Sequence, residues 1–198
     1  MTARLCVFDK IRLRRAQRGD RRATDGVLRE LLPMIRRTLY RMASCEAELD
    51  DLCQEALVQI ATSLPSFRGD SELGSWAHRV AIRSAWKFLR ARNNVIVFQP
   101  PGSSEVASDG PGRMVARTEL ARLETSLTKL PAEQRIVFVM RDVQGMTAVE
   151  TAELLEIPSG TVHSRLRAAR QKLGELWHPE IGKERKNEMS PKQHGGKA

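Results

Sequence analysis

Apolar residues recur three and four positions apart along most of this 198-residue chain, which is the spacing of a helix with one buried face. Leu, Ile, Val and Ala carry the apolar content, because aromatic residues make up only 5% of the sequence. Alternation by two, which marks a half-buried strand, is not the dominant pattern. We therefore expect an all-α protein made of two small helical domains.

The helical pattern is interrupted between residues 93 and 117, where Pro, Gly and Ser gather in the stretches 99–104 and 108–112. We predict a flexible linker over 93–117 that joins helical domains at 23–92 and 118–178. Residues 1–22 form a basic N-terminal segment. Residues 179–198 combine Gly and Pro with lysines and have little apolar content, which predicts a disordered tail.

One predicted helix has a purely acidic polar side, because residues 42–67 contain five acids and no Lys or Arg. On a helical wheel its apolar residues share one face, which we expect to be buried: Leu49, Cys53, Ala56, Leu57, Ile60 and Leu64. The opposite face carries Asp51, Glu55, Val58 and Thr62. Carboxylates beside an exposed valine suit a protein partner with basic groups around an apolar spot, and a merely solvated face is the alternative. Asp50 and Asp51 have no further metal ligand at helical spacing, so we predict no metal site.

The next predicted helix, from Trp76 to Arg90, is cationic. Its bases lie on one stripe, with a tryptophan on either side: Arg79, Arg83, Lys87 and Arg90, flanked by Trp76 and Trp86. The other face is small and apolar, so we expect the helix to be anchored on that side only. A cationic row beside flat rings can neutralise phosphates while an unpaired base stacks on a ring. The alternative is that the tryptophans edge the core and the arginines only solubilise the surface.

The polar loop 67–76 ahead of this helix contains two glycines and is long enough to form a pocket.

Signals of a helix-turn-helix follow the linker. Leu130-Pro131 begins a helix that runs through Val143, and Thr147 with Glu150 forms a capping box that begins a short helix over 148–155. Pro158 forces a turn, after which a helix runs from about residue 160 to 173. Its buried stripe is Val162, Leu166, Ala169 and Leu173.

The remaining surface of this last helix is cationic, rich in hydrogen-bonding groups and free of acids: Thr161, His163, Ser164, Arg165, Arg167, Arg170, Gln171 and Lys172. Such a helix fits the major groove, where Arg and Gln reach base edges while Lys, Thr and Ser hold phosphates. For His163 alone, a surface histidine with no role is the alternative.

The net charge of +9 favours polyanionic partners without choosing among them. No apolar run approaches the roughly 20 residues that span a bilayer, so we expect a cytoplasmic protein without membrane insertion. The three cysteines, Cys6, Cys45 and Cys53, are too few for a disulfide framework and are interpreted as reduced thiols, with a structural role favoured over redox sensing for the latter two. We find no nucleophile–base pair, metal cluster or phosphate loop, and so predict neither an enzyme nor a cofactor.

Five stretches, in order along the chain, resemble motifs of the extracytoplasmic-function sigma factors of bacterial RNA polymerase. They are Asp50-Asp-Leu-Cys-Gln-Glu-Ala56, Phe67-Arg-Gly-Asp-Ser71, Ser75-Trp-Ala-His-Arg-Val-Ala81, Leu130-Pro-Ala-Glu-Gln-Arg135 and Gly160-Thr-Val-His-Ser-Arg-Leu-Arg-Ala-Ala-Arg170. The resemblance implies a factor that binds core polymerase and directs promoter recognition, DNA opening and transcription initiation. A stand-alone helix-turn-helix regulator that binds operators without polymerase is the alternative.

The resemblance also implies residue roles. Domain 23–92 would be sigma region 2, and its acidic helix would grip the clamp helices of the largest polymerase subunit through Asp50, Asp51, Gln54, Glu55 and Val58. The loop and the basic helix would take the melted minus-ten strand, with one base flipped into a pocket, through Phe67, Arg68, Ser71, Trp76, Arg79, Arg83, Trp86, Lys87 and Arg90.

Domain 118–178 would be sigma region 4, which contacts the polymerase flap and reads the minus-thirty-five duplex through the eight polar residues of the last helix named above. The linker would pass near the polymerase active site and the RNA exit path. Relatives in this family are commonly held inactive by an anti-sigma factor, so the resemblance implies such a partner.

Three positions depart from the family pattern. Residues 80–87 read Val-Ala-Ile-Arg-Ser-Ala-Trp-Lys, which is more cationic than is usual for the family. His163 stands where Arg or Lys is common. Glu156 occupies a turn position that often holds Gly, and a positive φ there would cost on the order of 1 kcal/mol.

Overall fold

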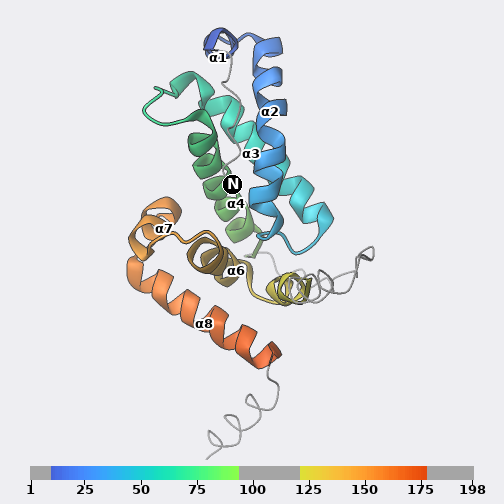
Figure 1. The fold of residues 1–198 in the computed structure, drawn as a ribbon, viewed down its shortest axis with the longest axis vertical. Coiled ribbons are helices and arrows are strands. Elements are labelled where there is room, and N and C mark those ends of the chain that lie inside the picture. Colours follow the sequence, from blue (N-terminus) through green and yellow to red (C-terminus); the bar gives the residue numbers. More distant parts are fainter. Residues whose placement is uncertain (1–9, 94–120, 178–198) are drawn as a thin grey trace, which may run out of the picture.

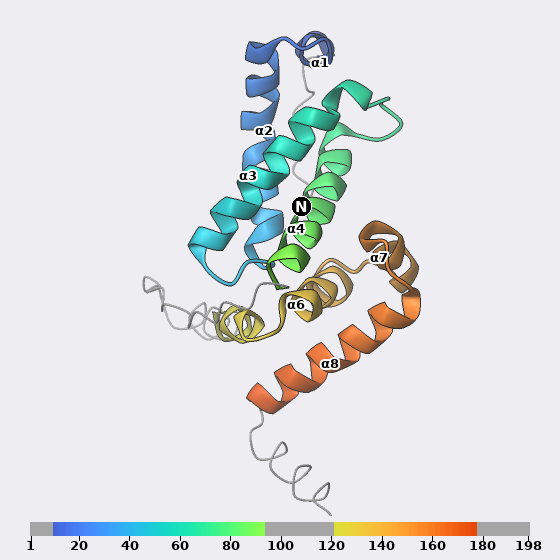
Figure 2. The same cartoon turned by 180° about the vertical axis from the view of Figure 1, so that it is seen from behind.

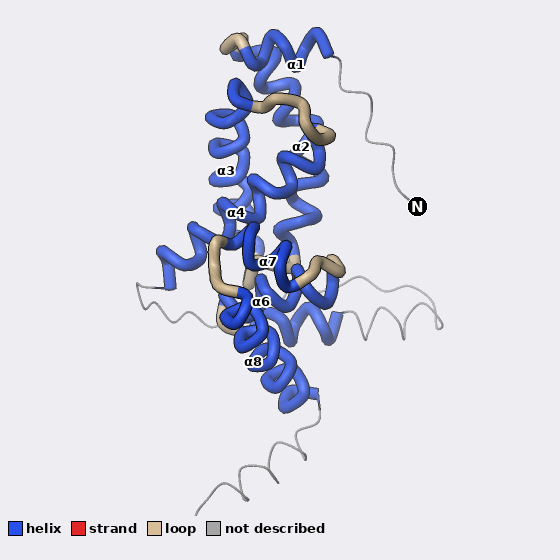
Figure 3. Tube along the Cα trace, turned by 90° about the vertical axis from the view of Figure 1, so that its left-hand side faces the viewer, coloured by secondary structure: helices blue, strands red, loops and turns tan. Residues whose placement is uncertain are grey.

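The computed structural model describes residues 10–93 and 121–177 (Figure 1). Throughout these two ranges the regular elements are helices and no strand occurs, which Figure 3 shows in one view. The all-α prediction is therefore confirmed. The predicted tail, and the predicted linker beyond Asn93, lie outside the described residues.

The first group of helices consists of α1 (Lys10–Gln17), α2 (Arg21–Tyr40), α3 (Glu46–Ser63), the 3-10 turn η1 (Leu64–Ser66) and α4 (Leu73–Asn93). Helices α2, α3 and α4 pack on one another and bury their apolar stripes between them (Figure 1). Asp20 caps α2 by accepting a hydrogen bond from the Ala23 N–H at 3.1 Å, and this bond holds the pKa of Asp20 below its usual value. The cap fixes where α2 begins.

Helix α1 was not anticipated in the basic N-terminal segment. Its only fully buried side chain is Ala16, and its arginines form ion pairs with the neighbouring α2 segment. Arg12 pairs with Glu30, and Arg15 donates to Asp20 at 2.6 Å and 2.9 Å. Ala16 and the partly buried Leu13 pack against the core cluster, and the exposed ion pairs add to this small apolar contact.

The second group begins with helical residues 121–128 and continues with α6 (Ala132–Phe138), the π-helical turn η2 (Val139–Val143), α7 (Ala148–Leu155) and α8 (Ser159–Trp177). The predicted helix over 130–143 is confirmed, with its last turn widened to π. The capping box of α7 is also confirmed, because the Glu150 N–H donates to Thr147 Oγ1 at 3.1 Å and the Thr147 N–H donates back to Glu150 Oε2 at 2.7 Å.

Glu156 has φ 56° and ψ 46°, so this turn position does adopt a positive φ and the cost given for that case applies. The fully buried residues of α8 are Val162, Leu166, Ala169 and Leu173, which is the predicted stripe.

The two groups of helices contact each other mainly through α4, with a further contact from Glu48 of α3 to Arg135 of α6. Helices α6 and α7 pack against its C-terminal half, while α2 and α3 cover its other side (Figure 2). The interpretation that this helix is anchored on one face only is therefore wrong. Hydrophobic periodicity located the face that meets α2 and α3. The second contact joins Trp86 and Leu89 to the same hydrophobic cluster as Ile136 of α6, with ion pairs around it, and a search for one apolar face does not reveal a second one.

None of the helices in the described ranges combines the length and apolar character needed to cross a membrane.

Candidate functional site

The polar face of α3 is arranged as predicted. Val58 is 57% exposed, Asp50, Asp51 and Gln54 are exposed, and Glu55 is half-buried. The buried face includes Leu49, Cys53, Ala56 and Ile60, with Leu52 in addition, while Leu57 is only partly buried. Acidic and apolar groups therefore lie together on one solvent-facing surface.

Two carboxylates on this face already have basic partners. Asp50 accepts a hydrogen bond from Arg36 at 2.7 Å, which raises the pKa of the Arg36 guanidinium. Asp51 lies 3.9 Å from Arg92 Nη1, a longer contact between two half-exposed side chains. Such exposed pairs contribute little to stability, so a partner can replace them at low cost.

Two cysteines fall within the described residues, and both are free thiols. Cys53 is buried and its burial raises the pKa of its thiol, whereas Cys45 is exposed. The core position expected for Cys53 is confirmed, whereas the burial on which a structural role for Cys45 was predicted is wrong, because Cys45 precedes the first turn of α3 and is exposed.

The loop before α4 is held by contacts at its first residue. The Phe67 ring lies 5.0 Å from the Trp76 ring, and the Phe67 carbonyl accepts a hydrogen bond from Gln17 Nε2 at 2.7 Å. Gly69 has φ 84°, a conformation that suits glycine, and Arg68 and Ser71 are exposed. The loop therefore presents polar groups beside a fixed aromatic pair.

All four bases of the cationic stripe of α4 are exposed: Arg79, Arg83, Lys87 and Arg90. Two of them also contact the second group of helices. Arg83 lies 3.6 Å from Glu156 and 3.5 Å from the Leu154 carbonyl oxygen, and Arg90 lies 3.5 Å from Glu133. These two arginines therefore have partners in the second group while their side chains stay about half exposed.

The predicted place of Trp86 beside the cationic stripe required an exposed ring. The residue is instead buried, with only 2% of its surface exposed. The guanidinium carbons of Arg90 and Arg165 lie over its ring, 5.5 Å and 5.1 Å from the centroid. The prediction of exposure was wrong because contacts from other elements, including α8, cover the ring. Trp76, by contrast, remains half-exposed.

The polar face of α8 is also partly engaged. His163, Ser164, Arg167, Gln171 and Lys172 are exposed, and Thr161 is half-buried. Arg165 pairs with Glu133, and Arg170 donates two hydrogen bonds to Asp142 at 2.6 Å and 2.9 Å, which raises the pKa of Arg170. Arg167 and Lys172 therefore keep exposed positions, whereas Arg165 and Arg170 are held by acids of their own group of helices.

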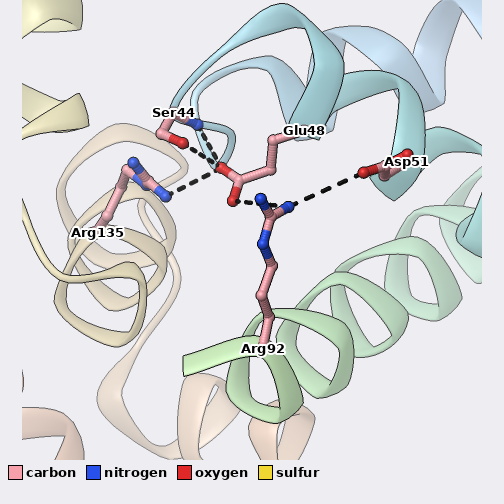
Figure 4. A network of polar contacts seen from close by, with 5 residues as sticks. All are labelled: Ser44, Glu48, Asp51, Arg92 and Arg135. Carbon is pink, nitrogen blue, oxygen red and sulfur yellow. Dashed lines mark hydrogen bonds and ion pairs between the residues drawn. The ribbon is translucent and has the colours of Figure 1, made fainter. Parts of the chain in front are cut away.

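Sequence reasoning missed a charged network between α3, α4 and α6 (Figure 4). Glu48 accepts hydrogen bonds from the Ser44 N–H at 2.5 Å, from Ser44 Oγ at 2.7 Å and from Arg135 Nη2 at 3.4 Å. Arg92 Nη1 lies 3.9 Å from Glu48 and the same distance from Asp51. A signal for Glu48 was available, because it falls in one row with Leu52 and Ala56, and an acid in an apolar row indicates a buried partner.

Within the described residues, no cluster of three or more His, Cys, Asp or Glu side chains could hold a metal ion.

Two known families match parts of the chain. Residues 27–95 match the family described as Sigma-70 region 2, and residues 120–173 match Sigma-70, region 4. The RNA polymerase sigma-H factor of Pseudomonas aeruginosa is 30% identical over 186 residues, which cover 86% of this chain and 94% of that protein. The ECF RNA polymerase sigma-E factor of Escherichia coli (strain K12) is 26% identical over 87% of this chain and 96% of its own length.

The chain belongs to the extracytoplasmic-function sigma factors. As a sigma factor it binds core RNA polymerase and directs promoter recognition and transcription initiation. A stand-alone regulator is not favoured, because a helix-turn-helix alone would leave the match to region 2 without explanation.

A solved structure agrees on the fold of this sigma factor. The sigma factor RpoE from Bartonella quintana, solved in complex with the anti-sigma factor NepR, superposes with a TM-score of 0.56 at 23% identity, over 77% of this chain and 95% of that chain.

Proposed function

We propose that three charged helical faces divide the work of this sigma factor. The acidic face of α3 docks on core polymerase, the loop 67–72 with α4 holds the melted minus-ten strand, and α8 reads the minus-thirty-five duplex. The observation that carries the proposal is the separation of charge: the polar face of α3 is acidic with an exposed valine, whereas α8 from Ser159 to Gly174 has no acid. One polyanion could not bind all three faces.

Docking on polymerase uses Asp50, Asp51, Gln54, Glu55 and Val58 against the clamp helices of the largest subunit. Val58 supplies apolar area at the centre, and the carboxylates around it select a basic partner and orient it. The pair between Asp51 and Arg92 is long and half-exposed, so a partner arginine can displace it.

The minus-ten strand is single-stranded when it is bound, so aromatic stacking and cationic contacts suffice to hold it. Phe67 and Trp76 form an aromatic pair between the start of the loop and the first turns of α4. Exposed polar groups for phosphates and a flipped base come from Arg68, Ser71 and Arg79. Arg83, Lys87 and Arg90 are exposed and continue the cationic row along α4. Trp86 is buried beneath this surface and supports it by packing.

Helix α8 reads the minus-thirty-five duplex. Arg167 and Gln171 are exposed and can make paired hydrogen bonds to base edges, while Thr161, Ser164 and Lys172 suit phosphates. His163 is exposed on the same face and adds a ring that can form hydrogen bonds to the duplex. In this assignment residues 23–92 act as region 2 and residues 118–178 as region 4, joined by 93–117, and the second unit also meets the polymerase flap.

Regulation by an anti-sigma factor is part of the proposal. The structurally similar RpoE was solved with its anti-sigma factor NepR, and a protein of that class would bind the charged surfaces described above. The sigma factor itself catalyses no reaction and acts in the cytoplasm, where bacterial RNA polymerase transcribes the chromosome.

Charge reversal on α3 tests the docking surface. The double variant Asp51→Lys/Glu55→Lys should lose co-purification with core polymerase, because two attractive contacts become repulsive. The control, Asp25→Lys/Glu153→Lys, reverses two carboxylates that lie outside α3, on α2 and α7, and should bind normally. Both variants should keep the helical circular dichroism of the unaltered chain. Normal binding by the α3 variant would remove polymerase docking from this face.

A further inference from the structure

A strongly cationic segment lies at the start of the described chain. Residues 10–22 contain seven Lys and Arg side chains and a single acid, Asp20. They form α1 and the first residues of α2, with a short turn between the two helices. None of the three charged faces proposed above includes this segment, so its charge has no assigned role.

Nearby acids neutralise only two of these seven cations. Arg12 pairs with Glu30, and Arg15 pairs with Asp20. The other five cations are exposed and form no ion pair among the described residues: Lys10, Arg14, Arg18, Arg21 and Arg22. Because like charges held close together repel, such a cluster gains from a polyanion that neutralises it.

Three of the five unpaired cations form one row. Lys10, Arg14 and Arg18 follow one another at intervals of four residues, which places them on one side of α1 and of the turn that follows it. Leu13 and Ala16 pack against the core from another side of the helix. Successive cations in this row advance by about 6 Å along the helix axis, so the row suits a ligand with repeated negative charges.

The first turn of α2 adds two cations at positions that helix stability disfavours. Arg21 and Arg22 begin this helix, and its first turn contains no acid. The amino end of a helix has a partial positive charge, so basic side chains there are unfavourable. These two arginines are therefore not explained by the stability of α2, whereas an anionic ligand would explain them.

Helix α1 lies beside the loop 67–72, to which the proposed function assigns the minus-ten strand. The Gln17 side-chain amide donates to the Phe67 carbonyl oxygen at 2.7 Å, and α1 also contacts η1. Figure 3 shows α1 and this loop at the same end of the first group of helices. The two acids of the loop, Asp70 and Glu72, are exposed and form no ion pair with α1 among the described residues. A strand held by the loop would therefore pass close to the cations of α1.

We propose that the cationic surface of residues 10–22 binds the phosphates of the melted promoter strand next to the minus-ten bases. This inference rests on the role proposed for the loop 67–72. Among residues 10–22 the one exposed large apolar side chain is Ile11, so the surface fits a polyanion better than an apolar protein surface. Phosphate contacts do not depend on base identity, so they add affinity and direct the path of the strand without changing which promoter is chosen.

The test uses holoenzyme assembled from core polymerase and the full-length sigma factor. Two fluorescent single strands serve as probes: one is limited to the minus-ten element of a promoter found by transcript sequencing, and the other extends it on both sides. The variant Arg14→Ala/Arg18→Ala removes two exposed, unpaired cations, and the control Arg29→Ala/Arg37→Ala removes two exposed arginines from the middle of α2. Arg14→Lys/Arg18→Lys keeps the charge. Circular dichroism checks that each variant is folded, and fluorescence anisotropy measures binding over a range of salt concentrations.

The variant Arg14→Ala/Arg18→Ala should bind the extended strand about tenfold more weakly than the control in ~0.1 M salt, and should bind the short strand normally. Its plot of log K against log salt concentration for the extended strand should be less steep by about 1.4, because each lost phosphate contact of a single strand removes about 0.7. Arg14→Lys/Arg18→Lys should keep both the affinity and the slope, since a phosphate contact needs the charge.

Equal affinities of the alanine variant and the control for the extended strand would overturn the inference. An equal loss for the short and the extended strands would overturn it too, because the segment would then act through its general field and not on neighbouring phosphates. If the unaltered holoenzyme failed to bind even the short strand, the proposed minus-ten role of the loop would be wrong and this inference with it. The short probe therefore distinguishes the two failures.

Discussion

Glu156 is the one non-glycine residue with a positive φ among the described residues, and replacing it by Gly should stabilise this sigma factor. The left-handed conformation ends α7, and the Ile157 N–H reaches back to the Ala152 carbonyl oxygen at 3.0 Å. A side chain at such a position costs about 1 kcal/mol relative to glycine. The substitution relieves that cost.

The substitution also removes an ion pair, which sets the size of the net effect. Glu156 lies 3.6 Å from Arg83, with side chains 60% and 48% exposed. An exposed pair of this kind is worth about 0–0.5 kcal/mol. Glu156→Gly should therefore raise the free energy of unfolding by roughly 0.5–1 kcal/mol. Glu156→Ala keeps the backbone strain and loses the ion pair, so it should lower the free energy of unfolding by up to about 0.5 kcal/mol.

Thermal unfolding of the full chain, followed by circular dichroism, measures the difference. The Gly and Ala variants both lack the ion pair, so the difference in Tm between them reports the backbone strain alone. About 1 kcal/mol corresponds to a difference in Tm of roughly 4–8 °C for a domain of the size of residues 118–178. Equal Tm values for the two variants would refute the reasoning about φ. A less stable Gly variant would mean that the residue does not adopt the left-handed conformation in solution.

Two further predictions concern the cap of α2 and DNA reading by α8. The pKa of Asp20 is lowered in the folded state, so its contribution to stability is present above the pKa of the unfolded chain and is lost as pH falls below about 4. Asp20→Asn should make the free energy of unfolding, measured with urea, fall less steeply as the pH is lowered. An unchanged pH dependence would show that the Asp20 carboxylate does not contribute to stability. Arg167→Ala should cost roughly 1–3 kcal/mol at selected bases of the minus-thirty-five element, whereas Lys172→Ala should weaken all sequences alike, and competition binding with mutated duplexes separates the two.

Local features of this sigma factor were predictable from sequence because their causes lie within a few residues. The capping box joins Thr147 to a residue three positions away, and the buried stripe of α8 follows from helical spacing. For Glu156 the sequence indicated only a turn position that often holds Gly, and the structure shows its positive φ. Each confirmed prediction depends on one helix and its own cap.

Contacts between distant segments were not predictable in the same way. Trp86 was expected to be exposed, but Arg165, a residue 79 positions later, lies over its ring. The partner of Glu48 is equally remote, and ionic contacts leave no periodic signal in the sequence. Helix α1 escaped prediction because its apolar contact is small, with Ala16 buried and Leu13 partly buried in a segment rich in arginine.

Transcription in vitro tests the central claim most directly. Purified core polymerase is supplied with bacterial genomic DNA, with and without this sigma factor, and the 5′ ends of the transcripts are sequenced. The account predicts new start sites that appear only when the sigma factor is present and that share two upstream motifs at a fixed spacing. Identical start sites in both reactions, under conditions where the sigma factor remains folded, would contradict it.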